Sequence, residues 1–104
     1  MNKPMVIFES IKRINEYKSE YWSARQLAKT LEYADYRNFE MVLKKAKESC
    51  KNSGQTIRDH FVDVTDMIEI GKNASREIKD TYLSRYACYL IMQNADPSKE
   101  IVDL

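Results

Sequence analysis

The most regular stretch of the sequence is YRNFEMVLKKAKESCK, which runs from Tyr36 to Lys51. Its apolar stripe consists of Tyr36, Phe39, Leu43, Ala46 and Cys50. Steps of three and four positions place these side chains on one face of an α-helix, with the charged residues opposite. The stretch therefore predicts a helix packed on a core. Gly54, just beyond it, is suited to the left-handed conformation that ends many helices.

A shorter helix is predicted just before this one. Ser23 followed by Gln26 has the form of a capping box, in which the serine side chain satisfies an amide left free at the helix start and the glutamine reaches back to the cap. Its apolar face would consist of Leu27, Ala28 and Leu31. Residues 32–35 break the pattern, and Asp35 is a suitable N-cap for the long helix. Two helices joined by a tight turn are therefore expected.

Towards the N-terminus, the stretch from Ile7 to Ile14 alternates imperfectly between apolar and polar residues. Its isoleucines also fit one face of a helix, so the pattern allows both structures. We favour a strand, because residues 15–20 are typical of a turn and Tyr21-Trp22 of the start of a return strand. An N-terminal β-hairpin is therefore expected.

Beyond the long helix, the pattern predicts a loop, a strand and a short helix. Residues 55–60 are polar, and Phe61-Val62-Asp63-Val64 alternates like a short strand. Thr65 can cap a brief helix over residues 66–70, and Gly71 would end it. Another polar loop is expected after that glycine.

The C-terminal part of the sequence predicts one more helix. After a polar loop over residues 72–77, residues 78–83 form a strand or an extended lead-in, and Ser84 caps a helix from Arg85 to Asn94. That helix is apolar nearly all round, so it lies at the centre of the core or is covered by something outside this chain.

Length and composition point to one α+β domain. A chain of 104 residues fits a single core, and 43% hydrophobic with 32% charged residues is ordinary for a compact protein. We expect an N-terminal β-hairpin followed by a helical core with short additional strands, over residues 1–96. Asp96-Pro97 would open a further helix, of which residues 97–104 are only the start.

Several function classes find no support in the sequence. Cys50 and Cys88 belong to no CxxC or CxxxH arrangement, so no metal is expected; two reduced, buried thiols are favoured, with a disulfide as the alternative. His60 is the single histidine and is expected at a strand edge, bonded to backbone. The sequence contains no nucleophile motif and no glycine-rich phosphate loop, so we expect neither an enzyme, a cofactor nor a small-molecule substrate.

Charge and hydropathy limit the partners. Seventeen basic and sixteen acidic residues give a net charge of +1, so any basic surface must be local. No apolar run is long enough to span a membrane and the N-terminus lacks the features of a secretory signal, so no membrane partner and a cytoplasmic location are expected.

The two predicted helices have the outline of a helix-turn-helix, in which the second helix enters the major groove of DNA. The basic residues on that helix are Arg37, Lys44, Lys45, Lys47 and Lys51. Glu32 stands where a turn glycine is common. The alternative is a pair of packed helices with a solvated basic face.

Two further sets of residues allow more than one interpretation. Arg76, Lys79 and Arg85 could contact phosphates or protein carboxylates, although a salt bridge between Arg85 and Asp80 would also explain that arginine. The tyrosines considered as base-stacking or interface residues, with core packing as the commoner role, are Tyr17, Tyr33, Tyr82 and Tyr89.

Whole phrases of the sequence resemble the DNA-damage-inducible protein D family. The phrases are EYWSARQLA at residues 20–28 with Asn38-Phe39, LSRYACYLI at 83–91 and QNADPSKE at 93–100. More faintly, the first half is similar to the amino-terminal domain of viral Bro proteins and phage antirepressors, with Glu32-Tyr33 in place of a Gly-Tyr turn. The first resemblance implies a bacterial SOS-type response protein without enzymatic activity that controls the recombinase filament on single-stranded DNA. The second implies a DNA-binding module.

Three hypotheses follow for the function. A nucleic-acid-binding module would use Arg25, Arg37, Asn38, Lys44, Lys45 and Arg85. A protein-interaction module, antirepressor-like, would dock on a recombinase or repressor through Tyr86, Tyr89 and Met92. The third possibility is that this part only supports folding or forms a homodimer, while a further C-terminal region carries the activity.

Overall fold

The computed structural model describes residues 8–95, which form an α+β fold. Residues 8–11 are helical. The elements that follow are β1 (Arg13–Ile14), β2 (Glu20–Ser23), α2 (Ala24–Thr30), α3 (Tyr36–Asn52), the 3₁₀ turn η1 (Ile57–Asp59), β3 (Phe61–Gly71), β4 (Ala74–Leu83) and α4 (Arg85–Asn94). The α+β class is thus confirmed, and an N-terminal hairpin of β1 and β2 is present.

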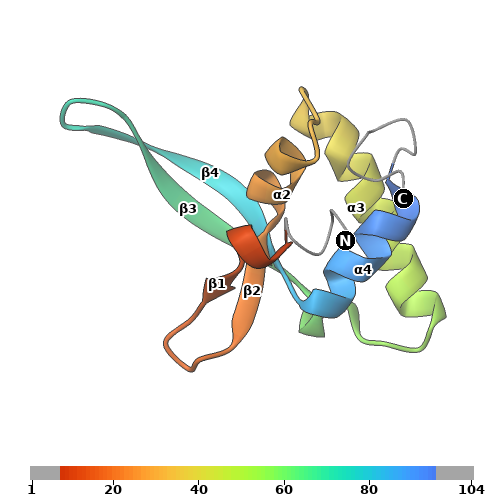
Figure 1. The fold of residues 1–104 in the computed structure, drawn as a ribbon. Coiled ribbons are helices and arrows are strands. Elements are labelled where there is room, and N and C mark those ends of the chain that lie inside the picture. Colours follow the sequence, from red (N-terminus) through yellow and green to blue (C-terminus); the bar gives the residue numbers. More distant parts are fainter. Residues whose placement is uncertain (1–7, 96–104) are drawn as a thin grey trace.

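The four strands form one antiparallel sheet in the order β1-β2-β4-β3. β2 pairs with β4 at only two positions, where Trp22 and Ser23 face Leu83 and Tyr82. Beyond these positions β3 and β4 continue as a two-stranded ribbon that projects from the body of the molecule (Figure 1). We call residues 64–80 of this ribbon the arm.

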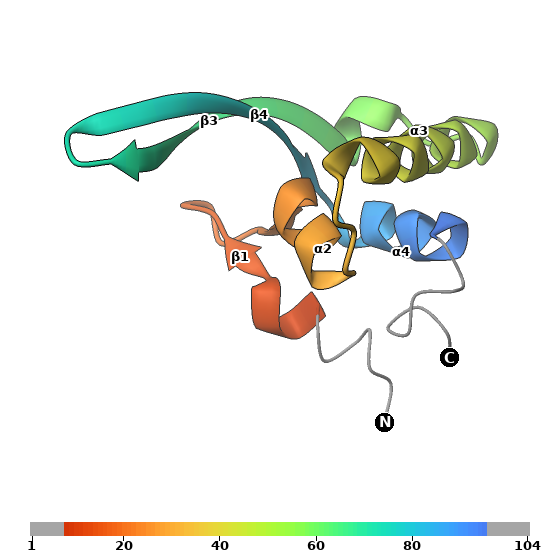
Figure 2. The ribbon, with the colours of Figure 1, turned by 90° about the horizontal axis from the view of Figure 1, so that it is seen from above.

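The helices cover one face of the base of the sheet. α3 and α4 pack side by side, and α2 lies between them and the β1–β2 hairpin (Figure 2). The largest fully buried side chains are Trp22, Phe39, Leu27, Leu31, Leu83, Ile91, Cys50 and Cys88. A buried side chain of this size contributes about 1.5–3 kcal/mol. The core therefore sits between the three helices and the base of the sheet, away from the arm.

The predicted helix signals are largely confirmed. The side chains of Ser23, Asp35 and Ser84 accept hydrogen bonds from the first turns of α2, α3 and α4, at 3.2, 3.0 and 3.0 Å. Gly54, just past α3, has a φ of +84°. The capping box is only half formed, because Oε1 of Gln26 is buried without a hydrogen-bond partner among the described residues.

The prediction of a strand from Ile7 to Ile14 is wrong for residues 8–11. These residues are helical, and only Arg13–Ile14 belong to the sheet. The carbonyl of Phe8 accepts a hydrogen bond of 2.8 Å from Trp22 Nε1, and the two rings meet edge to face at 6.2 Å. Tertiary contact with the buried tryptophan thus favours the helical alternative that the isoleucine spacing had left open.

The predicted helix over 66–70 and loop over 72–77 are also wrong. β3 extends to Gly71 and β4 begins at Ala74, so only two residues turn the chain. Asn73 takes the left-handed conformation that this tight turn needs, with a φ of 60°. Thr65 and Gly71 are therefore strand residues, because cross-strand pairing outweighs the local helix signals.

The remaining predictions stand as follows. Cys50 and Cys88 are free and buried, in agreement with the favoured reduced state. No helix in the described part of the chain is long and apolar enough to cross a membrane. The helix predicted to begin at Asp96-Pro97 lies outside the described residues, and the boundary at residue 96 stays a prediction.

Candidate nucleic-acid interface

Four of the five basic residues predicted on α3, namely Arg37, Lys44, Lys45 and Lys51, are exposed, whereas Lys47 is half-buried and meets Asp63 of β3 at 4.0 Å. Phe39, Leu43 and Ala46 face the core, so the opposite side of the helix is open to solvent. Arg37, Lys44 and Lys51 recur every seven residues and therefore form one row, about 21 Å long at 1.5 Å per residue. All three side chains are exposed. The row presents three cations at intervals of two helical turns.

Most cations of this face are free to bind an external anion. Within residues 8–95, Lys44, Lys45 and Lys51 form no ion pair. Arg37 contacts Asp35 at 3.3 Å, but its side chain remains 85% exposed. Asn38 is exposed in the first turn beside Arg37. Such exposed ion pairs are weak, so Arg37 can exchange Asp35 for another anion.

Arg25, the predicted residue on α2, is held by several groups. Its guanidinium carbon lies 4.2 Å from the centre of the Tyr36 ring, and its Nε donates to the carbonyl of Lys79. Its backbone amide donates to Asp80 at 3.0 Å. Burial raises the pKa of Tyr36 to about 12, so the stacked phenol is neutral at physiological pH. Arg25 therefore occupies a fixed position.

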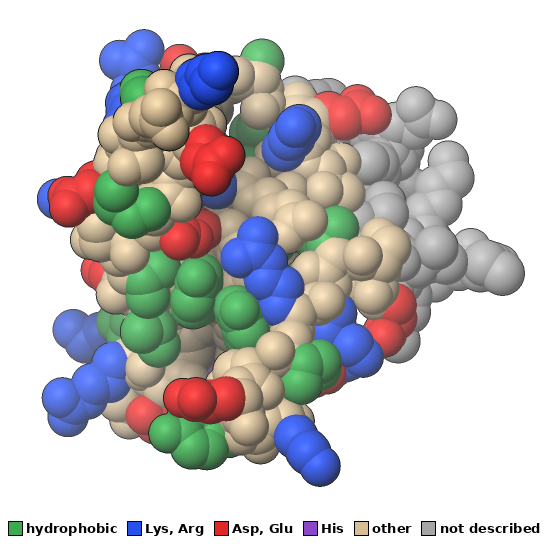
Figure 3. All heavy atoms as spheres, turned by 90° about the vertical axis from the view of Figure 1, so that its left-hand side faces the viewer, with side chains coloured by type: hydrophobic (Ala, Val, Ile, Leu, Met, Phe, Trp, Pro, Cys, Tyr) green, Lys and Arg blue, Asp and Glu red, His purple; other side chains and the backbone are tan. Residues whose placement is uncertain are grey.

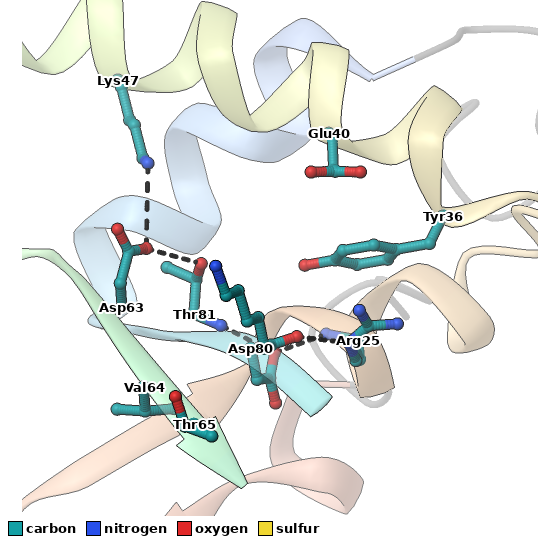
Figure 4. A pocket seen from close by; sticks show the side chains of 10 residues that line it. Arg25, Tyr36, Glu40, Lys47, Asp63, Val64, Thr65, Asp80 and Thr81 are labelled. Carbon is teal, nitrogen blue, oxygen red and sulfur yellow. Dashed lines mark hydrogen bonds and ion pairs between the residues drawn. The ribbon is translucent and has the colours of Figure 1, made fainter. Parts of the chain in front are cut away.

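A cleft of about 450 Å³ separates α3 from the base of the arm (Figure 4). Its charged lining residues are Arg25, Lys47 and Lys79 against Glu40, Asp63 and Asp80. Lys47 and Asp63 approach each other across the cleft, with a distance of 4.0 Å between Nζ and Oδ1. Because the two signs balance, the cleft itself does not attract a polyanion, in contrast to the row on α3.

Arg85, predicted as a phosphate ligand, is engaged by two carboxylates. Its guanidinium donates to Glu20 at 2.8 and 2.9 Å and to Glu9 at 3.1 Å, and it lies 5.3 Å from the Trp22 ring centre. The carboxylates raise the pKa of Arg85 and it lowers theirs. The suggested salt bridge with Asp80 is therefore wrong, since the partners are Glu9 and Glu20. Arg85 lies outside the row on α3.

The residues predicted to bind a protein partner differ in accessibility. Tyr86 is half-buried, with its hydroxyl 2.7 Å from Ser53 Oγ and its ring 4.8 Å from that of His60. Met92 packs against the core, and Tyr89 is 66% exposed. Of the three, only Tyr89 offers a largely free side chain.

His60 and the remaining tyrosines have mostly structural contacts. His60 Nδ1 lies 2.7 Å from Ser84 Oγ, so its ring contacts a hydroxyl and not backbone as predicted. Tyr33 meets Phe39 at 5.2 Å and Tyr82 meets Tyr21 at 4.7 Å. Tyr17 is 80% exposed at the β1–β2 turn. In the described part of the chain, no cluster of three or more His, Cys, Asp or Glu residues could hold a metal ion.

Comparison with known proteins places the chain in a family. The family described as BRO family, N-terminal domain, matches residues 10–102. This chain belongs to that family. It is also 56% identical over 102 residues to DNA damage-inducible protein D of Escherichia coli strain K12. The resemblances noted in the sequence are thereby confirmed.

The relationship covers different shares of the two proteins. The alignment includes 98% of this chain and 37% of the E. coli protein, so the chain spans little more than a third of that relative's length. No solved structure matches the chain.

In this BRO N-terminal domain, Asp80 links the arm to α2, a role that the sequence did not predict. Asp80 is only 6% exposed and accepts hydrogen bonds from Ser23 Oγ and the Arg25 amide. An aspartate between a lysine and a threonine gives no local signal of this role, because its partners lie more than fifty residues away in sequence.

Proposed function

We propose that this chain is a non-catalytic regulatory module of a DNA-damage response that binds DNA through the exposed face of α3. The name of the E. coli relative supports a link with DNA damage. The resemblance to Bro proteins implies DNA binding. The observation that carries the proposal is the row of Arg37, Lys44 and Lys51, whose exposed cations are aligned on one helix. Within residues 8–95, Lys44 and Lys51 form no ion pair, and Arg37 forms only a weak exposed pair with Asp35.

The arrangement of elements supports the same function. α2 and α3 are joined by residues 31–35, and the β3–β4 hairpin follows α3. β2 pairs with β4 next to that hairpin, which is the order of a helix-turn-helix followed by a β-wing. In such folds the second helix enters the major groove and its N-terminal residues contact base edges. Arg37 and Asn38 occupy that position on α3.

The number of phosphates that the row on α3 contacts sets the expected salt dependence of the affinity for DNA. Each phosphate neutralised by a cation releases counterions, and the logarithm of affinity falls with a slope of about −0.9 per contact. Three contacts on duplex DNA therefore predict an affinity loss of about 40-fold between 50 and 200 mM salt. A chain with a net charge of +1 has little attraction for DNA apart from such a local patch.

Fluorescence anisotropy with labelled single- and double-stranded DNA at these two salt concentrations tests the proposal. We expect salt-sensitive binding by the chain. The double variant Arg37→Ala, Lys44→Ala should lower the affinity at least about 10-fold at low salt and reduce the salt slope by about two.

A matched control removes the same charge elsewhere. Lys18→Asn with Lys29→Ala changes two exposed lysines on the β1–β2 turn and α2, and Asn tolerates the φ of 63° at position 18. Its affinity should stay closer to that of the unchanged chain than to that of the α3 variant. Absence of binding at 50 mM salt, or an equal loss in both variants, would refute DNA binding through α3.

A second candidate function is docking on a protein, such as a recombinase filament on single-stranded DNA. The exposed Tyr89 on α4 favours it, since a stiff aromatic side chain is a common interface anchor. Such binding would tolerate salt and weaken in Tyr89→Ala, while the α3 variant would leave it unchanged. The part of the E. coli relative beyond this alignment is a further place where the regulatory activity could reside.

A further inference from the structure

The face of the sheet that points away from the helical core carries more apolar side chains than the opposite face of the arm. Residues directly opposite each other in an antiparallel pair share a face, so the strand register assigns every side chain. The aliphatic and aromatic residues on this outer face are Tyr21, Val62, Val64, Ile68, Ile78 and Tyr82. The same register places three charged residues there, Asp66, Arg76 and Asp80. The core residues Trp22, Phe61 and Leu83 belong to the other face.

Within residues 8–95, α2 covers the outer face at the base of the arm, where the buried Asp80 accepts a hydrogen bond from the Arg25 amide, and the face is more exposed towards the tip. β3 packs against β4 and η1, and the helices contact the sheet at its base. Val62 and Ile68 are 47% and 39% exposed. Seen from this side, hydrophobic side chains gather between the arm and the β1–β2 hairpin, with charges of both signs around them (Figure 3). A solvated sheet face is normally polar, so this one is suited to a partner.

The two ends of the outer face carry groups that attract each other, namely aromatic rings at the base and an arginine towards the tip. At the base, Tyr21 and Tyr82 stack with ring centres 4.7 Å apart. Towards the tip, Arg76 pairs across the strands with Ile68 and forms no ion pair within the described residues. Six residues of strand separate Arg76 from Tyr82, about 20 Å at 3.3 Å per residue. One end thus offers aromatic rings and the other an arginine that binds such rings.

The edge of the ribbon is protected against pairing with itself. β3 is the outermost strand and carries Asp63, Asp66 and Glu69, without a basic residue. Two copies joined edge to edge through β3 would oppose these carboxylates, which is a common device against such association. A partner is therefore better accommodated on the apolar face than at the edge.

We propose that the outer face of the arm docks a second copy of this chain, with the two arms antiparallel. A two-fold axis then places Arg76 of each copy over the Tyr21–Tyr82 pair of the other, and Val64 and Ile78 near the centre. Asp66, which faces Ile78 across the ribbon, also lies near this axis, and repulsion between the two Asp66 carboxylates weakens the association. The ring faces attract the guanidinium, and the aliphatic residues remove each other from water. The net charge of +1 opposes this self-association very little.

The size of the face sets the strength of the dimer. The arm is narrow, and a standard interface buries roughly 800 Å² per partner. The β1–β2 hairpin beside the arm adds area through Tyr21. We expect an equilibrium between monomer and dimer with a dissociation constant of about 1–100 μM, which depends on protein concentration.

Sedimentation equilibrium of the 104-residue chain between about 1 and 500 μM, a range chosen to bracket that constant, measures this association directly. We expect Ile68→Lys and Arg76→Glu each to raise the dissociation constant at least about tenfold. Met67→Lys is the matched control, because Met67 is the adjacent residue on the opposite face and is 56% exposed. Its dissociation constant should stay within about twofold of that of the unchanged chain. Circular dichroism of each variant serves as the control for folding.

Cross-linking tests the orientation of the two arms. Ile78 lies near the proposed two-fold axis, so Ile78→Cys should join two copies through a short bismaleimide. Lys79→Cys, which points to the other face, should not. The native thiols of Cys50 and Cys88 are buried and do not compete.

Two outcomes would overturn the proposal. The first is a chain that stays monomeric over the whole concentration range, which would leave the face to a different protein. The second is an equal weakening by Ile68→Lys and Met67→Lys, which would mark non-specific association. Neither measurement involves DNA, so a failure of dimerisation is distinguishable from a failure of DNA binding through α3.

Discussion

Asp80 shows how one side chain joins distant parts of the chain. Its carboxylate accepts hydrogen bonds from the Ser23 hydroxyl and from the backbone amides of Arg25 and Thr81. It therefore lies at the N-terminus of α2, where negative charge is favoured by the helix dipole. β4 and α2 are held together by a group that is almost completely buried.

Replacement of Asp80 should be costly. We expect Asp80→Ala to lower the free energy of unfolding by about 2–3 kcal/mol, because it leaves the Ser23 hydroxyl and the Arg25 amide without their acceptor. Urea denaturation measures this difference. Glu77→Ala on the same strand is the control, since Glu77 is exposed, and it should change the value by less than about 0.5 kcal/mol. Similar losses in both variants would contradict the role of Asp80.

The row on α3 illustrates what residue patterns can and cannot determine. A seven-residue recurrence on an amphipathic helix already predicts that Arg37, Lys44 and Lys51 are aligned and exposed. The engagement of Arg85 by Glu9 and Glu20 was not predictable, because these acidic residues lie 76 and 65 positions away in sequence.

At the scale of elements, Arg85 connects the N-terminal helical residues, β2 and α4. The pKa of Glu9 and that of Glu20 lie below their ordinary value of 4.5, chiefly because of hydrogen bonds from Lys12 to Glu9 and from Arg85 to Glu20. A carboxyl whose pKa is lowered by folding stabilises the folded state above its unfolded pKa and loses this effect as pH falls through the folded pKa. Glu9 is exposed and Glu20 is partly exposed, so the effect is modest.

The pH dependence of this cluster is testable by comparison with Arg85→Gln. We expect the variant to be less stable than the unchanged chain at pH 7, and the gap between their free energies of unfolding to shrink as pH falls below about 4.5. Chemical denaturation between pH 7 and pH 3 measures the gap. Arg58→Gln, at an exposed site, should show no comparable gap. A gap that persists unchanged at pH 3 would contradict the carboxylate pairing.

Elements with local signals were predicted better than those without. α2, α3 and α4 were expected near their observed positions because helix caps and apolar stripes involve residues three or four apart. The long hairpin was interpreted as a strand, a helix and a loop, because its hydrogen bonds join residues up to 22 positions apart and outweigh the local signals of Thr65 and Gly71.

At the scale of the whole molecule, the arm and the helical body are separate parts. The buried core lies at the base of the sheet, and most of the arm is exposed. A two-stranded ribbon has little stability of its own in water, so the arm depends on the body to hold its base. The body, in turn, is linked to the arm mainly at its base, where Lys79 and Asp80 accept hydrogen bonds from Arg25.

Shortening the arm should therefore leave the body folded. Asp66 and Ile78 face each other across the ribbon, so residues 67–77 can be replaced by an Asn-Gly turn. We expect the melting temperature measured by calorimetry to change by less than about 5 °C, which corresponds to roughly 1 kcal/mol for a chain of this size. Dimerisation should be lost, and binding of DNA by α3 should persist. Loss of cooperative unfolding would show that the arm supports the core.

The sequence by itself determined the α+β class, the three main helices with their caps, the absence of catalytic motifs, the basic row on α3 and the family. All of these depend on residue types and on spacings of a few positions. Only the tertiary structure decided the length of the β3–β4 hairpin, the partners of Arg85 and Asp80, and the apolar outer face of the sheet. These depend on pairing between distant residues, and strand register alone determines which side chains share a face.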